Sequence, residues 1–269
     1  MQAKQPIGIF DSGIGGLTVA RAVKELLPNE QIIYFGDTAH LPYGDKSTAA
    51  IQSYSVKISQ WLLEKNCKVI LIACNSASTA AYDLIREYTG KKAKVFDVIN
   101  PVIDHLREKY RDNKVGLIGT LQTVNSGVYQ KKIDDIKANI DFSSLATPLL
   151  VPMIEEGFHK KEITEAIISE YLENPVLKDI SALILGCTHY PVIKEEIQSL
   201  IGESTDVIDS SVITAKALRG YLEYNNLLNE KPEGEDHFYV SDYTSNFEFS
   251  TRFFFKKEVH LEKYPLWDD

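Results

Sequence analysis

Two cysteines occupy the positions in this sequence that most clearly suggest chemistry. Cys74 and Cys187 each follow an apolar, strand-like run and precede a stretch with helical character. Positive helix ends and nearby amide groups lower the pKa of a thiol from about 8.5, and a shift to about 7 corresponds to roughly 2 kcal/mol. A cysteine in such a setting can act as a base. Cys67 precedes its strand and lacks these neighbours, so we assign it no chemistry.

Two converging thiols suggest a disulfide redox pair, a metal site, or two acid/base groups on opposite faces of one substrate carbon. Redox pairs commonly use Cys-X-X-Cys, and zinc sites usually have four ligands at clustered spacings; the sequence has neither pattern. A single cysteine at a strand end is more often a small buried hydrophobe, so it is the pairing that favours chemistry. The favoured chemistry is stereoinversion, in which one thiolate removes a Cα proton and the opposite thiol protonates the other face.

A glycine-rich turn, DSGIGG at residues 11–16, follows the first strand-like run. Backbone N–H groups in such a turn can cradle an anion. The spacing is not GxGxxG and no Gly-Lys-Ser/Thr follows, so the nucleotide interpretations lack their defining parts. The alternative is that the glycines only ease a tight turn and that Asp11 only caps the next helix.

Other polar side chains after the strands fit roles around the thiols, because ligands of parallel α/β sheets bind outside the carboxyl ends of the strands. Asp11 or Glu155 is a candidate to orient or deprotonate a thiol. His189 follows Cys187 by two positions and is a candidate for the same role on the other side. Three residues are candidates to hydrogen-bond an amino-acid carboxylate: Asn75, Ser76 and Thr188.

Short apolar runs alternate with helical patterns along the whole chain, which predicts parallel strands joined by crossover helices. We expect strands at residues 7–10, 32–35, 69–74, 95–98, 115–118, 182–185 and 207–208. Helices are expected at 17–27, 48–63, 80–88, near 128, at 162–172, after 192 and at 213–224. A strand and a helix rich in aromatic residues close the chain.

The second half of this series echoes the first. The run VILIACNS at 69–76 resembles SALILGCT at 181–188, and IGIFDS at 7–12 resembles VGLIGT at 115–120 more weakly. We therefore expect an α/β fold of two pseudo-symmetric domains with mainly parallel central sheets and an active site in the interdomain cleft. The first domain is expected to comprise residues 1–98 plus 210–269, and the second residues 99–209.

Composition limits the classes of partner. The chain has 269 residues, 44% of them hydrophobic and 25% charged, with a net charge of -9. An acidic protein is not expected to bind nucleic acid or anionic membranes. The apolar runs fall far short of the roughly 18 residues that span a bilayer, and the polar start has no signal-peptide pattern. Three sparse cysteines indicate free thiols, and we expect a cytoplasmic protein.

Five segments resemble, in the same order, the active-site segments of bacterial glutamate racemases, which belong to the aspartate/glutamate racemase superfamily. They are IFDSGIGGLTV at 9–19, GDTAHLPYG at 36–44, ACNSAS at 73–78, VPMIEEG at 151–157 and LGCTHYP at 185–191. The ending, FYVSD at 238–242 with Phe247 and Phe253, is also similar. The resemblance spans nearly the whole chain.

This resemblance implies an isomerase that interconverts L- and D-glutamate without a cofactor or metal and supplies D-glutamate for peptidoglycan, and hence for cell wall and cell shape. It implies that Cys74 takes the proton from D-glutamate and Cys187 from L-glutamate, assisted by Asp11, Glu155 and His189. A homodimer is expected. The implied substrate contacts are Asp11, Ser12, Tyr43, Gly44, Asn75, Ser76, Thr188 and His189.

Two departures and two alternatives accompany this interpretation. Ser76 stands where threonine is commoner, and Glu156 beside Glu155 leaves open which carboxylate faces the site. Aspartate racemases share the paired cysteines, but relatives of that type tend to carry an acidic residue where this chain has His189. One methylene of substrate length is worth only about 1 to 3 kcal/mol in discrimination. A noncatalytic amino-acid-binding module explains the glycine turn but not the paired cysteines.

Overall fold

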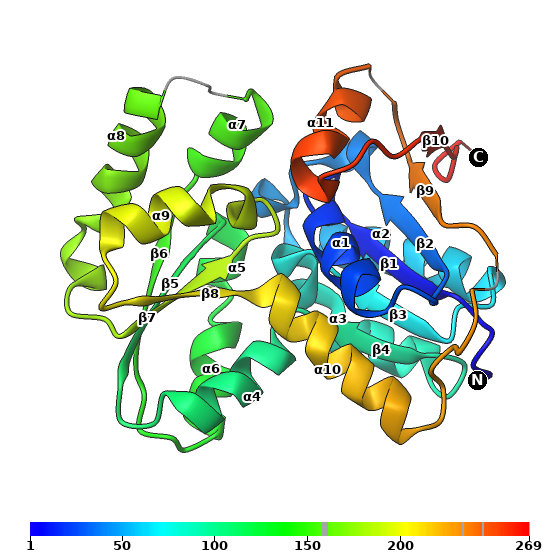
Figure 1. The fold of residues 1–269 in the computed structure, drawn as a ribbon, viewed down its shortest axis with the longest axis horizontal. Helices are drawn as coiled ribbons and strands as arrows, with labels where there is room; N and C mark the ends of the chain where they lie inside the picture. The colour runs from blue at the N-terminus through cyan, green and yellow to red at the C-terminus, as the bar shows by residue number, and fades with distance from the viewer. Residues whose placement is uncertain (158–160, 233, 244, 269) are drawn as a thin grey trace.

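The computed structural model describes residues 1–157, 161–232, 234–243 and 245–268. In these residues the chain forms two sheets of parallel strands covered by helices (Figure 1). The larger sheet has the order β10-β9-β2-β1-β3-β4 and the smaller sheet the order β6-β5-β7-β8. The α/β fold class predicted from the sequence is confirmed.

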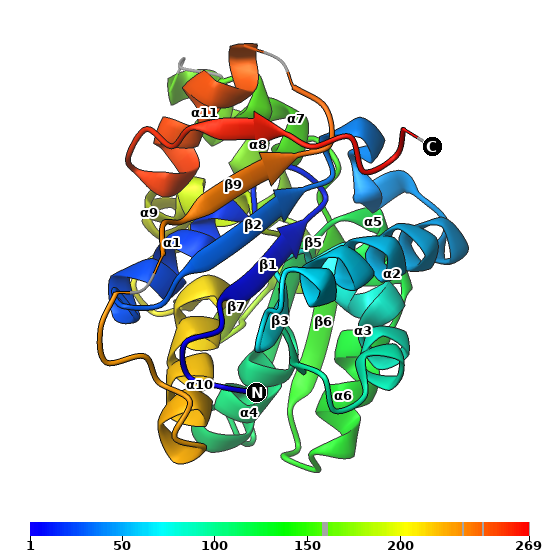
Figure 2. The same ribbon diagram turned by 90° about the vertical axis from the view of Figure 1, so that its right-hand side faces the viewer.

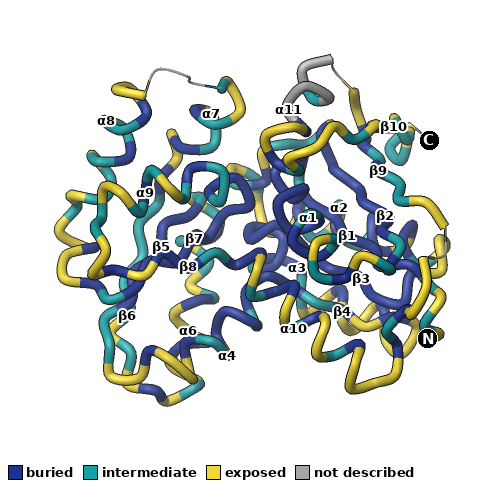
Figure 3. Tube along the Cα trace, in the orientation of Figure 1, coloured by how far each residue is buried: buried dark blue, intermediate teal, exposed yellow. Residues whose placement is uncertain are grey.

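The strands of the larger sheet are β1 (Ile7–Asp11), β2 (Ile32–Gly36), β3 (Val69–Ile72), β4 (Lys94–Asp97), β9 (His237–Val240) and β10 (Leu261–Lys263). Those of the smaller sheet are β5 (Lys114–Gly119), β6 (Asp141–Ala146), β7 (Ala182–Gly186) and β8 (Asp206–Asp209). Every residue of β1, β2, β3 and β7 is buried, as expected of parallel strands with both faces covered (Figure 3).

Helices that carry the chain between strands are α1 (Leu17–Leu26), α2 (Thr48–Glu64), α3 (Asn75–Thr89), α4 (Asn100–Lys109), α5 (Leu121–Asn125) and α6 (Val128–Asp135). Later helices are α7 (Leu150–Glu155), α8 (Lys161–Leu172), α9 (Lys194–Ile201), α10 (Ser210–Tyr224) and α11 (Ser245–Phe255). Single turns of 3-10 helix are η1 (Thr38–His40), η2 (Tyr43–Asp45), η3 (Pro175–Leu177) and η4 (Tyr190–Ile193). Among the described helices, none combines the length and apolar character needed to cross a bilayer.

One apolar core runs from a face of the larger sheet to a face of the smaller sheet. It joins Ile9 of β1 and Leu71 of β3 to Leu218 of α10, and it continues to Leu117 of β5 and Ile184 of β7. A second core fills the other face of the larger sheet beneath α2 and α3. Because the first core is shared, the carboxyl ends of both sets of strands are held in one packed structure.

The strands and helices expected from apolar runs are confirmed, with ends that differ by a few residues. The sequence interpretation missed β6, whose pattern DFSSLA has no buried residue because it lies at the edge of its sheet. It also missed α4, which begins at Asn100 with Pro101 in its first turn. After α10 the tail returns to the larger sheet as β9 and β10. The domain boundaries given above stay predictions.

Candidate active site

Both thiols lie within two residues of the carboxyl end of a strand. Cys74 follows β3 and is the N-cap residue of α3, where its sulfur accepts the Ala77 backbone N–H at 3.4 Å. Cys187 follows the last residue of β7 and precedes η4. Each keeps only 6% of its surface exposed, and both line one pocket. The positions that echo each other in sequence therefore meet in space.

The pocket has an empty volume of about 770 Å³, including its open mouth. Strand ends of both sheets contribute to its wall. Ten of the residues predicted for the site line it: Ser12, Tyr43, Gly44, Cys74, Asn75, Ser76, Glu155, Cys187, Thr188 and His189. Asp11 is the predicted residue that does not line the pocket, because its side chain is fully buried behind the wall.

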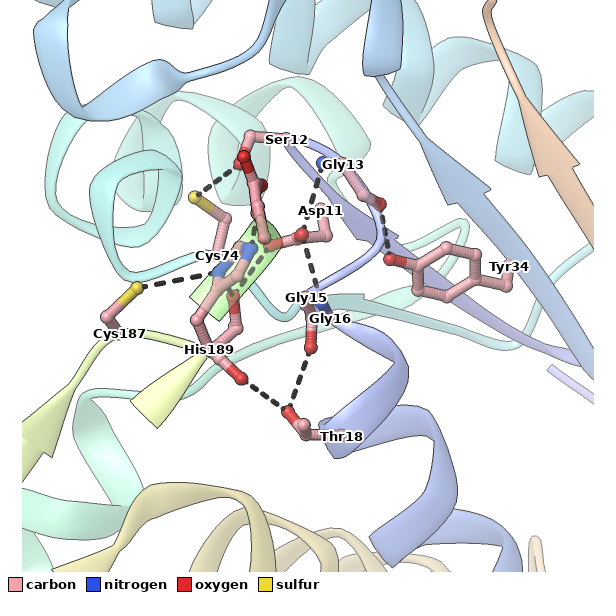
Figure 4. A network of polar contacts seen from close by, with 12 residues as sticks. Asp11, Ser12, Gly13, Gly15, Gly16, Thr18, Tyr34, Cys74, Cys187 and His189 are labelled. Carbon is pink, nitrogen blue, oxygen red and sulfur yellow. Dashed lines mark hydrogen bonds and ion pairs between the residues drawn. The ribbon is translucent and has the colours of Figure 1, made fainter. Parts of the chain in front are cut away.

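The backbone of the glycine-rich turn binds the side-chain carboxylate of Asp11. The Asp11 carboxylate accepts the backbone N–H groups of Gly13 and Gly16 at 3.1 and 2.9 Å (Figure 4). Burial raises the pKa of Asp11, and the charge of His189 and these N–H groups oppose the rise. The turn is therefore not a free phosphate cradle. Gly16, not Asp11, is the N-cap residue of α1.

Close approach of the second sheet explains the glycine at position 15. A Cβ atom there would lie 2.4 Å from the His189 ring and 2.8 Å from the Thr188 hydroxyl. The hydroxyl of Thr18, in α1, donates to the Thr188 backbone carbonyl at 2.8 Å. The turn and the start of α1 thus pack directly against the loop that carries Cys187.

The surroundings of Cys74 favour the neutral thiol. Burial raises the pKa of Cys74 to about 12, the nearby charge of Asp11 adds to the rise, and hydrogen bonds from Ala77 and to Ser12 oppose it. The thiol lies 3.8 Å from the Ser12 hydroxyl. The expectation that a helix end would lower this pKa is therefore wrong for Cys74, since desolvation and a buried carboxyl outweigh one amide contact. At neutral pH Cys74 is equipped to donate a proton.

Cys187 faces a different partner. Its sulfur lies 3.7 Å from Nδ1 of His189, and Nε2 of the same ring lies 2.9 Å from Oε1 of Glu155. Burial alone would lower the pKa of His189, but its hydrogen bonds to Cys187 and Glu155 and their charges raise it to about 10. A charged imidazolium beside the sulfur stabilises negative charge there. Of the two adjacent glutamates, Glu155 is the one that reaches His189.

Some polar residues at the site were not predicted, among them Thr120, Thr147 and Tyr129. Thr120 and Thr147 line the pocket, and the Thr120 hydroxyl lies 2.9 Å from that of Ser76. Thr120 follows β5 as Ser12 follows β1, so the weak echo between residues 7–12 and 115–120 carried the signal for it. Tyr129 donates to Oδ1 of Asn75 at 2.9 Å. No local motif distinguishes Tyr129 from a core tyrosine.

No group of three or more His, Cys, Asp or Glu side chains is placed to hold a metal ion in the part of the chain that the structure describes. The site thus offers a buried thiol that carries a proton and a second thiol beside a buried cation, both facing one cavity. Two such groups facing one cavity are chemically able to move a proton from one face of a substrate carbon to the other.

Comparison with known proteins identifies the family of this chain. The Asp/Glu/Hydantoin racemase family matches residues 16–218. Glutamate racemase from Neisseria meningitidis serogroup A is 44% identical over 241 residues, covering 89% of this chain and 88% of that protein. Glutamate racemase from Chlorobaculum tepidum is 39% identical over 260 residues, covering 96% of this chain and 95% of that protein.

The structural likeness is equally extensive. The crystal structure of glutamate racemase from Francisella tularensis in complex with D-glutamate superposes with a TM-score of 0.91 at 41% identity, covering 98% of this chain and 99% of that one. The chain therefore belongs to the Asp/Glu/Hydantoin racemase family.

Proposed function

We propose that this protein is a glutamate racemase that interconverts L- and D-glutamate with its two thiols, without a cofactor. The observation that carries the proposal is the placement of Cys74 and Cys187 on one pocket with opposite electrostatic surroundings. The relatives named above, at 39% to 44% identity, support glutamate as the substrate.

The reaction is described first from L-glutamate. Cys187, acting as a thiolate beside the His189 imidazolium, removes the Cα proton, so the C–H bond breaks and an S–H bond forms. The electron pair stays on the carbon as a planar carbanion. The Cys74 thiol then delivers its proton to the opposite face, which yields D-glutamate and a Cys74 thiolate. The protein then has Cys187 as the thiol and Cys74 as the thiolate, which is the state that accepts D-glutamate for the reverse reaction.

Supporting groups divide between the two thiols. Glu155 holds His189 and acts on Cys187 through it, whereas Asp11 acts on Cys74 through its charge. The substrate carboxylates and amine are proposed to meet the predicted contacts on the pocket wall: Ser12, Tyr43, Gly44, Asn75, Ser76, Thr188 and His189. Asp11 supports this wall from behind by holding the Ser12–Gly16 turn.

The wider roles belong to the same proposal. A racemase that makes D-glutamate fits the supply of peptidoglycan precursors in the cytoplasm, and we propose a homodimer in solution. Aspartate stays the competing substrate, since the two amino acids differ by one methylene. The resemblance of the Cys187-Thr188-His189 segment to glutamate racemases supports the longer substrate.

Proton NMR in D₂O tests the reaction and the substrate together. Purified, thiol-reduced protein is given L-glutamate, and in a separate sample L-aspartate, with no added cofactor, and each product is analysed on a chiral column. Loss of the glutamate Cα–H signal with appearance of D-glutamate is the expected result. Exchange confined to aspartate would move the assignment to that substrate, and folded protein inactive on both would favour the noncatalytic binding module.

A further inference from the structure

A second buried carboxylate, Asp37, lies directly after β2 and outside the thiol machinery. Its side chain is fully buried and is approached by four side-chain groups from three parts of the chain. The Tyr43 hydroxyl donates to Oδ2 at 2.6 Å, and the Ser241 hydroxyl and the Trp267 indole N–H each donate to Oδ1 at 2.8 Å. Nδ1 of His40 lies 3.0 Å from Oδ2. Asp37 thus ties these segments together.

One of the tied segments is a wall of the active site. Residues 41–45 all line the pocket, and Tyr43 in this segment is almost wholly buried. The Tyr43 hydroxyl is committed to Asp37, so the position of its ring depends on where that carboxylate is held. The groups that hold the Asp37 carboxylate in place therefore also position the pocket wall at residues 41–45.

Another tied segment is the end of the tail. Strand β10 pairs with β9 at the edge of the larger sheet and leads the tail back toward the segment that follows β2 (Figure 2). There the Trp267 ring makes T-shaped contacts with the rings of His40 and Tyr54, at centroid distances of 4.6 and 5.5 Å. Lys57 Nζ lies 5.2 Å from the Trp267 ring centroid. The indole is thus packed from several sides and donates its N–H inward.

We infer that Trp267 is a positioning residue for the active site: through Asp37 it holds Tyr43 and the wall at 41–45 in the position that binds substrate. The inference rests on the proposed function, because glutamate turnover is its readout. A buried carboxylate that loses one of its donors moves toward the remaining ones, and this shifts the tyrosine that shares it. Loosening the wall weakens substrate binding in both directions of the reaction and leaves the thiols in place.

The second tryptophan of the chain supplies a matched control. Trp61 belongs to α2 and is buried in the second core, and its Nε1 has no hydrogen-bond partner among the described residues. Trp61→Phe and Trp267→Phe remove the same atoms, but only the second removes a donor from Asp37. We expect Trp267→Phe to raise KM for L- and D-glutamate by roughly fivefold with kcat changed less than about twofold. Trp61→Phe leaves KM within about twofold of wild type.

A double-mutant cycle separates positioning from general loss of stability. If Trp267 acts through Asp37 and Tyr43, the KM effects of Trp267→Phe and Tyr43→Phe combine to less than their product. Ser241→Ala removes another Asp37 donor and provides the same KM test should Trp267→Phe fail to fold. A wild-type KM in Trp267→Phe, or a lowered melting temperature with KM unchanged, would overturn the inference alone. Wild-type protein without glutamate turnover would overturn the proposed function and the inference with it.

Discussion

The imidazole of His189 stands between a thiol and a carboxylate, and its charge depends on both. Glu155 lies on one ring nitrogen and Cys187 on the other, and together they raise the pKa of His189 to about 10 against the effect of burial. Asp11 and Ser12 surround Cys74 instead. The two thiols are therefore equivalent in position and different in electrostatics, which suits a reaction that needs one acid and one base.

Glu155→Gln tests this arrangement at the residue scale. The substitution keeps the shape of the side chain and removes its charge, so the pKa of His189 falls toward its ordinary value of 6.5. We expect kcat/KM for L-glutamate to fall roughly tenfold, equivalent to about 1.4 kcal/mol, and the alkaline limb of its pH profile to move to lower pH. Steady-state rates between pH 6 and 10 measure both effects.

Glu156→Gln is the matched control, because the neighbouring glutamate is exposed and does not line the pocket. Its profile should superimpose on that of the wild type. An effect of Glu156→Gln equal to that of Glu155→Gln would contradict the assignment of Glu155 as the partner of His189.

The first strand-to-helix turn matters at the scale of elements, since the Cys187 loop rests on it. Gly15→Ala places a methyl group 2.4 Å from the His189 ring, so the ring or the turn must shift. We expect turnover to fall at least about tenfold, because small displacements of catalytic groups are costly. Gly220→Ala in α10 is the control, since its methyl group would enter open space and Gly220 does not line the pocket. Equal turnover in the two variants would contradict this role of the turn.

Part of the fold and part of the candidate site could be predicted from the sequence. Alternating apolar runs predicted the buried strands, because hydrophobicity and chain direction decide which segments enter a parallel sheet. The paired cysteines indicated the site because ligands of parallel α/β sheets bind outside the carboxyl ends of the strands. The sequence could not show that Asp11 fills its own glycine turn or that Tyr129 reaches Asn75, because both contacts depend on distances set by the whole fold. It also could not place Trp267 on Asp37, 230 residues away in the chain.

At the scale of the whole molecule, buried titratable groups such as His189 and Cys74 make stability depend on pH. His189 and Cys74 both hold a proton more tightly in the folded protein, with pKa values raised from 6.5 to about 10 and from 9.0 to about 12. The contribution of His189 is fully present below pH 6.5 and is lost as pH rises through about 10; that of Cys74 is lost between about 9 and 12.

We therefore expect the melting temperature to fall as pH rises above 6.5, with a shallower slope between pH 6.5 and 10 in His189→Asn. Differential scanning calorimetry in buffers of matched ionic strength measures the slopes. Parallel slopes for wild type and His189→Asn would contradict the raised pKa of His189.

The central claim is that both thiols are needed in both directions, and single substitutions test it most directly. Cys74→Ser, Cys187→Ser and the control Cys67→Ala are assayed for racemisation from L- and from D-glutamate, with folding checked by circular dichroism. Cys67 is buried away from the pocket, so its variant should keep wild-type turnover. Each active-site variant should lose racemisation from both enantiomers by on the order of 10²- to 10⁴-fold. Full turnover in either one, from either enantiomer, would contradict the two-thiol account.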